Sequence, residues 1–331
     1  MSDEPKKRSQ AKGLSRACLS VTLFTLVVFA AHQGAHYLPA QQPSPKPITL
    51  ATLVDVMEAR EKLADSMTVR WTKSERYRAG ALLAKQSTWT SPCEMLLKGG
   101  SMRYVGKTFS IVGGSPNVID HVSSYDGNES RYLQGTKPPL GRILEKKVNT
   151  DARTSALLPL MLYFRPLAEP YDTLKRKTLK LVDERKTIDG HECVTVDDGS
   201  LRVNLDCERD FVPVAYQFYL EKGAQAAESS RPGFVLQDGS IEYYRKQDAL
   251  RWYPKASQVT FHNRGQEGVP DRIRGDGVQT QIGAPLKDRD FALIFEPGTV
   301  VWDARTPEVY RILSDGSKET IRRGRRRAPA K

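Results

Sequence analysis

The sequence predicts a mainly β (α+β) protein: a strongly curved antiparallel sheet or half-barrel with one or two helices packed on it, plus an N-terminal transmembrane helix. Apolar and polar residues alternate along about a dozen segments, which is the period of a strand. Asp-Gly pairs, the strongest short-range signal of a hairpin, separate several of these segments. Few segments have helical character, so such a sheet has to curl on itself to cover its apolar face.

The N-terminal transmembrane helix is predicted at residues 17–35. This segment carries no formal charge, and a basic leader at residues 1–16 precedes it. A basic flank before an apolar stretch directs export and keeps the leader in the cytosol. No residues suited to signal cleavage follow the apolar stretch, which favours a retained single-pass anchor in the inner (cytoplasmic) membrane with the domain facing the periplasm. The alternative is secretion to the periplasm after cleavage.

The rest of the chain divides into four predicted parts. Residues 36–48 form a Pro-rich linker, and residues 49–283 form the curled β domain. A C-terminal β-hairpin extension follows at 284–316, with a turn at Pro297-Gly298, and residues 317–331 are a basic disordered tail. The tail is either a solvated end or a contact for an anionic surface. Because the leader and the tail hold much of the net charge of +12, the central domain is close to balanced, and no specific nucleic-acid partner is expected.

Two segments are predicted to be helical. Thr52 and Asp55 give a capping-box-like start to a helix over residues 50–65, whose apolar residues recur on one face. The segment 156–164 is apolar without alternation. It is predicted to be a short helix or a lid, capped by Ser155 or by the threonine before it.

The remaining pattern is a series of strands joined by tight turns. The predicted hairpin turns are Asp126-Gly127, Asp189-Gly190, Asp198-Gly199, Asp238-Gly239 and Asp315-Gly316. The strands are predicted near 67–71, 93–97, 102–106, 118–125, 129–133, 179–181, 194–196, 201–205, 212–220, 241–244, 250–253, 258–261, 291–295, 300–302 and 310–313.

The sequence contains no motif of a known catalytic site. A nucleophile elbow, a phosphate-binding loop, a dinucleotide-binding glycine pattern and a metalloprotease helix are all missing from it. The five histidines are scattered, and the carboxylate pairs fall at turn positions, where Asp is favoured for its own backbone hydrogen bonds. We therefore expect a non-enzymatic protein without a metal or cofactor.

The cysteines do not form a metal or redox motif. Cys93, Cys193 and Cys207 lack the CxxC spacing of such sites. A bridge between Cys193 and Cys207 is conceivable in an oxidising compartment. The predicted register of the following turn opposes it, because that register places Cys193 opposite Asn204.

Four stretches resemble the LolA/LolB-type lipoprotein-carrier fold, in the divergent form found in outer-membrane lipoprotein-sorting-like envelope proteins. They are Met57–Trp71, Val122–Tyr132, Leu201–Val214 and Tyr243–Pro254, and the resemblance covers about residues 49–283. It implies a half-barrel closed by helices, with an apolar cavity that accepts acyl chains. The predicted anchor and the greater length depart from a soluble carrier, and the resemblance transfers no individual site residue.

Large apolar side chains recur on one face of several predicted strands. They form either the ordinary core or the wall of an apolar cavity. These possible cavity-lining residues are Trp71, Met95, Tyr104, Phe218, Tyr243, Trp252 and Phe261. The sequence thus predicts an extracytoplasmic, membrane-anchored, non-enzymatic protein that binds a lipid or a lipoprotein acyl chain. The alternative is a structural or partner-binding envelope domain with a filled core and no ligand.

Overall fold

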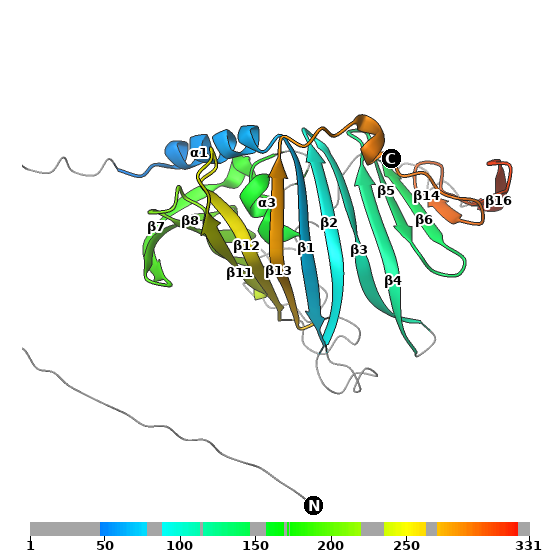
Figure 1. The fold of residues 1–331 in the computed structure, drawn as a ribbon, viewed down its shortest axis with the longest axis horizontal. Coiled ribbons are helices and arrows are strands. Elements are labelled where there is room, and N and C mark those ends of the chain that lie inside the picture. Colours follow the sequence, from blue (N-terminus) through cyan, green and yellow to red (C-terminus); the bar gives the residue numbers. More distant parts are fainter. Residues whose placement is uncertain are drawn as a thin grey trace, which may run out of the picture. The chain divides into compact units, whose positions relative to one another are not determined.

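Sixteen strands form one open sheet in the part of the chain that the structure describes, accompanied by two α-helices (Figure 1). This structure is a computed structural model, and it describes residues 47–77, 88–112, 115–145, 157–168, 171, 173–219, 235–262 and 270–323. From Ile48 onwards the chain forms one compact unit. The mainly β architecture predicted from the sequence is therefore confirmed.

The helices are α1 (Leu50–Leu63) and α3 (Leu158–Phe164). The strands are β1 (Ser66–Arg76), β2 (Thr88–Lys98), β3 (Ser101–Val112), β4 (Ser115–Tyr125), β5 (Glu129–Gln134), β6 (Leu140–Glu145), β7 (Lys180–Ile188), β8 (His191–Asp197), β9 (Leu201–Asp206), β10 (Pro213–Tyr219), β11 (Val235–Arg245), β12 (Trp252–Phe261), β13 (Arg272–Ile282), β14 (Val300–Asp303), β15 (Glu308–Ile312) and β16 (Lys318–Arg323). Their order across the sheet is β16-β15-β14-β6-β5-β4-β3-β2-β1-β13-β12-β11-β10-β9-β8-β7. Neighbouring strands are antiparallel, except that β6 and β14 are parallel.

Helix α1 begins three residues earlier than the predicted capping box. The N-cap is Thr49, whose side chain accepts a hydrogen bond from the backbone N–H of Thr52 at 3.2 Å, so the predicted role of Thr52 and Asp55 as the start is wrong. Leu53 and Met57 are buried one turn apart, and this apolar face docks the helix on the unit.

Helix α3 is a core element and not a surface lid. All seven of its residues are buried, including Pro159 in the first turn, where its missing N–H leaves no bond unmade. The residue before the helix is Leu157, which makes no side-chain capping bond, and the predicted caps at residues 154–155 lie outside the described residues. The apolar composition therefore reflects burial on every side of the helix.

The sheet curves around α3 (Figure 1). Tyr125 on β4 and Cys193 on β8 belong to the same apolar cluster as Met161 and Phe164 of α3. Nine inter-strand steps separate β4 from β8, which is about 43 Å in a flat sheet at about 4.8 Å per strand. A seven-residue helix is only about 10 Å long, so a single cluster can join these strands only if the sheet bends.

Four of the five predicted Asp-Gly turns are confirmed, between β4 and β5, β7 and β8, β8 and β9, and β15 and β16. The fifth, Asp238-Gly239, is wrong, because this pair lies inside β11. Gly239 is opposite Tyr216 of β10 in the register, and the tyrosine ring lies across it. A Cβ atom on Gly239 would sit 2.4 Å from that ring, so a long-range contact explains the glycine.

Several strand predictions also need correction. Residues 291–295 are not a strand, because they follow a 3₁₀ turn (Asp288–Phe291) as an extended segment that is not paired in the sheet. The segments near 250–253 and 258–261 meet in the single strand β12. Strands β6, β13 and β16 were not predicted at all, and β16 occupies part of the segment predicted to be a disordered tail; residues 324–331 lie outside the described residues.

The C-terminal extension belongs to the same sheet and is reached by a crossing segment, which we call the strap (residues 284–296). The strap passes over the ends of successive strands (Figure 1). One side chain from each of five strands binds it: Ser66 Oγ of β1 donates to the Ala284 carbonyl at 2.6 Å, Lys98 Nζ of β2 pairs with Asp288 at 2.9 Å, Arg103 of β3 donates to the Asp290 carbonyl at 3.1 Å, Ser124 Oγ of β4 donates to the Phe291 carbonyl, and Arg131 of β5 donates to the Leu293 carbonyl at 2.9 Å. The strap therefore takes the chain from the middle of the sheet to β6, where β14 pairs.

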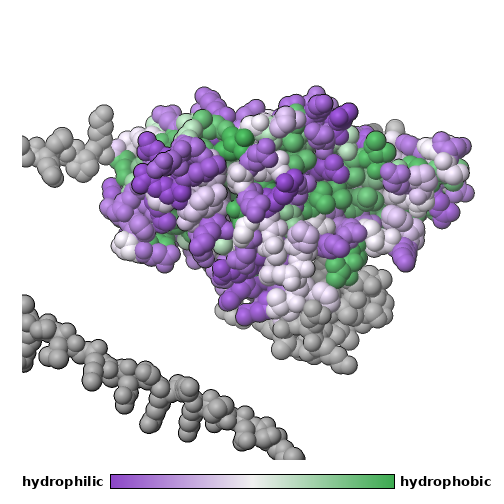
Figure 2. Space-filling view, viewed as in Figure 1, coloured by the Kyte–Doolittle hydropathy of each residue, from purple (hydrophilic) through white to green (hydrophobic). Residues whose placement is uncertain are grey.

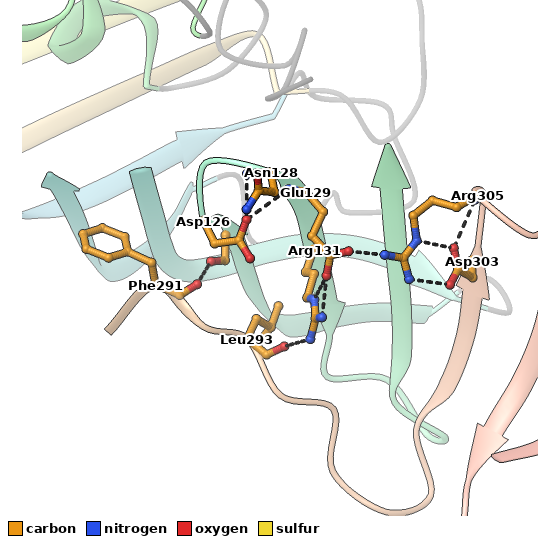
Figure 3. A network of polar contacts seen from close by, with 9 residues as sticks. Asp126, Asn128, Glu129, Arg131, Phe291, Leu293, Asp303 and Arg305 are labelled. Atoms are coloured by element: carbon orange, nitrogen blue, oxygen red, sulfur yellow. Dashed lines mark hydrogen bonds and ion pairs between the residues drawn. The ribbon is translucent and has the colours of Figure 1, made fainter. Parts of the chain in front are cut away.

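A network of charged side chains locks the end of the strap to β5 and β14 (Figure 3). The Glu129 carboxylate accepts hydrogen bonds from both Arg131 and Arg305. Arg305 also makes two bonds to the buried carboxylate of Asp303, at 2.9 and 2.7 Å. Because one acid joins Arg131 of β5 to Arg305 in the turn after β14, the extension is held by more than its backbone pairing.

The predicted membrane anchor lies outside the described residues, as does the leader before it. Within the described segments between residues 47 and 323, we find no helix with both the length and the apolar character to span a bilayer.

Gly239→Ala should destabilise the protein by about 1–3 kcal/mol, because the new methyl group overlaps the Tyr216 ring and one of the two strands has to move. Urea unfolding followed by circular dichroism measures the change. Gly100→Ala is the matched control, since nothing lies within 4 Å of a Cβ at that position. Equal stability of the two variants would show that the ring does not press on β11.

Arg131→Ala should lower the free energy of opening of the C-terminal extension by about 1–3 kcal/mol. The substitution removes the hydrogen bond to the Leu293 carbonyl and leaves Glu129 with one cation fewer. Relative to the unmodified protein, hydrogen exchange should be faster at the β14 amides of the variant and unchanged at those of β1. Arg311→Ala is the control, since Arg311 is exposed and pairs with Glu319 only at 3.7 Å. Unchanged protection of β14 in Arg131→Ala would show that the charged network around Glu129 does not hold the extension.

Candidate functional site

The candidate site is the concave face of the sheet around α3. The structure places five of the seven predicted cavity residues there: Trp71, Met95 and Tyr104 are members of the apolar cluster that contains α3, and Tyr243 and Trp252 pack against it. The other two, Phe218 and Phe261, pack against a second cluster that joins α1 and α3 to β8, β9 and β10. The predicted set is thus divided between two clusters.

The first aromatic group lies on β1 to β3. The rings of Trp71 and Tyr104 stack with centroids 6.0 Å apart and an interplanar angle of 28°. The Tyr104 hydroxyl is 3.4 Å from the Sγ atom of Cys93. Burial raises the pKa of the Cys93 thiol, so this thiol is protonated at neutral pH and is a poor nucleophile.

The second aromatic group joins α3 to β11 and β12. The rings of Tyr163 and Tyr243 are 5.4 Å apart between centroids. The Tyr163 hydroxyl donates to the Trp252 carbonyl, and the Tyr243 hydroxyl donates to the Pro213 carbonyl at 2.7 Å. The polar end of each ring is therefore used within the fold.

A buried arginine closes this group from the side of α1. Arg60 is only 6% exposed, and its guanidinium lies 4.8 Å from the centroid of the Tyr163 ring. Its Nη2 atom donates to the carbonyls of Asp210 and Phe211, at 2.7 and 3.2 Å, in a turn where both residues have positive φ. Burial lowers the pKa of Arg60. Arg60 thus pins a strained turn between β9 and β10 to the end of α1.

The sequence interpretation missed a buried ion pair on the same concave face. Lys73 and Glu75 of β1 are 4% and 6% exposed, and Lys73 Nζ lies 2.7 Å from Glu75 Oε1. Lys73 also donates to the Lys107 carbonyl at 2.7 Å, and the Tyr77 hydroxyl donates to Glu75 at 3.2 Å. The sequence does contain a sign of this burial, because Lys73 and Glu75 follow Trp71 at every second position and therefore point to the same face of β1.

The cysteines do not form the conceivable bridge. Cys193 and Cys207 are free thiols, and burial raises the pKa of Cys193 to about 11. The register predicted for this hairpin is wrong by two residues, since Cys193 lies opposite Asp206 and not opposite Asn204. The difference arises because the turn closes between Asp197 and Arg202. No cluster of metal-ligating side chains occurs among the residues described.

Lys73→Met should destabilise the protein by about 3–5 kcal/mol, because it leaves the Glu75 carboxylate buried without its cation. The double variant Lys73→Met/Glu75→Leu should recover most of that loss, since no buried charge remains. Chemical denaturation measures both. The control is Arg70→Met on the same strand, whose partner Glu94 is exposed enough that the loss stays under about 1 kcal/mol. A double variant no more stable than Lys73→Met would contradict this account.

No protein-family model matches the chain, and no curated protein sequence matches it. Among solved structures, the chain is similar to a domain from Vibrio parahaemolyticus described as an outer membrane lipoprotein-sorting protein domain, at 11% identity and a TM-score of 0.41, over 72% of this chain and 95% of that one. It is also similar to MucB in complex with the periplasmic part of MucA (9% identity, TM-score 0.17, 71% and 100% covered) and to the MucA/MucB complex of Pseudomonas aeruginosa (11%, 0.17, 72% and 96%). At these identities and TM-scores, similarity carries no information about a ligand or partner.

Proposed function

We propose that the chain is a membrane-anchored, extracytoplasmic and non-enzymatic binding protein, and that its curved sheet is a scaffold for a protein partner. The observation that carries this proposal is the complete burial of α3 in the concave face. A drug-sized or lipid ligand needs a preformed cavity of about 300–1,000 Å³. Here the side chains of α3 occupy the space between the strands that an acyl chain would need.

The edge strand β16 is the surface that we assign to the partner. It ends the sheet on one side, and its residues 318–322 are exposed. A terminal strand offers free backbone groups to which an extended peptide can add as a further strand. Both edge strands carry a register irregularity, between Val182 and Lys186 in β7 and at Ile321 in β16, but β7 is partly buried whereas residues 318–322 of β16 are all exposed.

A photo-crosslinking amino acid in place of Ile321 should give a discrete protein adduct in intact cells. Ile321 is 51% exposed and lies on the free edge strand. The matched control is the same substitution at Val118, which is 48% exposed on the interior strand β4 and should give no adduct. Equal yields from both positions, or no adduct from Ile321, would contradict partner binding at this edge.

The second candidate is binding of an acyl chain in the space that α3 occupies. The observation that favours it is that α3 is held almost entirely by apolar contacts. Within the described residues, its one side-chain hydrogen bond to the sheet joins Tyr163 to Trp252. An acyl chain of about sixteen carbons gains about 13 kcal/mol on burial, at about 0.8 kcal/mol per methylene. Burial of the five Leu, Met and Phe side chains of α3 contributes about 7.5–15 kcal/mol, at about 1.5–3 kcal/mol each, which is comparable to the gain of the acyl chain.

Native mass spectrometry of the full chain in mild detergent, with lipid extraction, separates the two candidates. For the scaffold we expect no bound lipid at one per chain, and no rise in Tm when palmitate is added. A ligand at 100 times its Kd stabilises the folded state by about 2.7 kcal/mol, which is a shift of a few degrees. Tyr163→Phe keeps the ring and releases α3 from Trp252, so the variant should capture lipid only if the second candidate is correct.

A further inference from the structure

A pocket of about 490 Å³ lies at the turn between β11 and β12, outside the concave core and away from β16. Its walls are Arg245, Lys246, Gln247, Asp248 and Arg251. The pocket is open to solvent, so it suits a small group held by charge and not a large apolar ligand. Three of the five lining side chains carry a positive charge and one carries a negative charge.

The turn that forms the pocket is held in a fixed shape. The N–H of Lys246 donates to the Arg251 carbonyl at 2.7 Å, and the N–H of Arg251 donates to the Asp248 carbonyl at 3.2 Å. Arg251 has a φ of +59°, a conformation that a residue other than glycine adopts only when its surroundings enforce it. Leu250 is buried beneath the turn. The backbone therefore presents its side chains from a rigid frame.

The single acid in the pocket is already fully engaged. The Asp248 carboxylate accepts hydrogen bonds from the Tyr253 hydroxyl at 2.8 Å and from the Leu250 N–H at 3.2 Å. It also pairs with Lys246 Nζ at 3.2 Å. Asp248 and Lys246 thus neutralise each other, and their role is to hold the turn together.

Two arginines remain as surplus charge. No hydrogen bond or ion pair of the Arg245 side chain occurs among the described residues. Arg251 reaches only the half-exposed carboxylate of Asp210, at 3.9 Å. Asp248 lines the same pocket but is already bound by Lys246 and Tyr253, so the two guanidinium groups can still recognise an oxyanion through paired N–H donors.

We propose that this pocket binds a phosphate group, through the guanidinium groups of Arg245 and Arg251. The amide of Gln247 lies in the same wall and supplies a further donor. The phosphate is either free inorganic phosphate or the diester of a lipid headgroup, since both offer at least two unesterified oxygens to the two arginines. This site is independent of the partner-binding edge proposed above.

Isothermal titration calorimetry of the full chain in a neutral detergent tests the proposal with two soluble probes. Inorganic phosphate represents the free ion, and glycerophosphoglycerol represents the headgroup of an anionic lipid. We expect saturable binding of at least one probe at one site per chain, weakened by added salt. Preference for glycerophosphoglycerol assigns the site to a lipid headgroup, and preference for inorganic phosphate assigns it to the free ion.

The double variant Arg245→Gln/Arg251→Gln should bind the preferred probe at least tenfold more weakly. The control Arg274→Gln/Arg311→Gln removes the same charge from two exposed arginines elsewhere in the sheet and should bind as the unmodified protein does. Circular dichroism verifies that each variant is folded. Absence of saturable binding, or an equal loss in both double variants, would overturn the proposal, because the attraction would then be nonspecific.

Discussion

The burial of α3 against a bent sheet is the constraint on which the rest of the structure depends. A sheet of this width exposes an apolar face that two helices cannot cover while it stays flat. Bending brings strands from both halves onto one short helix, and its side chains then meet β4 and β8 in a single cluster. The curvature, the position of α1 over the same helix and the absence of alternation in the α3 sequence all follow from this one contact.

Polar side chains, in contrast, bind the turns and the strap to the ends of the strands. Arg60 fixes the β9–β10 turn to α1, and the strap is bound strand by strand from β1 to β5. These bonds go mostly from side chains to carbonyls, so each one satisfies a backbone acceptor outside the ladder. The face in view in Figure 2 has hydrophobic residues in separate patches between polar ones, as expected where such bonds lie near the surface.

Features set by neighbouring residues could be predicted from the sequence, whereas features set by contacts between distant segments could not. Asp-Gly pairs form turns through their own backbone preferences, so most of the hairpins could be found. The turn predicted at Gly239 is wrong because this glycine makes room for the ring of Tyr216 on the next strand. The helix over α3 could be foreseen, whereas its place inside the bend could not. Lys73 and Glu75 share the parity of Trp71, but a charged residue is ordinarily assigned to solvent, so their burial needed coordinates.

The distribution of cations separates groups that serve the fold from groups that remain available. Lys73 is matched by a carboxylate, and Arg60 and Arg165 donate to backbone carbonyls around the end of α1, so none of these buried charges has the open room to take a ligand. Arg245 and Arg251 differ in both respects, because they are exposed and they face one pocket on a frame whose acid is already engaged. Arg251 is held at a positive φ beside this open pocket, and its one ion pair is the long contact with Asp210 at 3.9 Å, so the two arginines are not bound by the fold in the way that Lys73, Arg60 and Arg165 are.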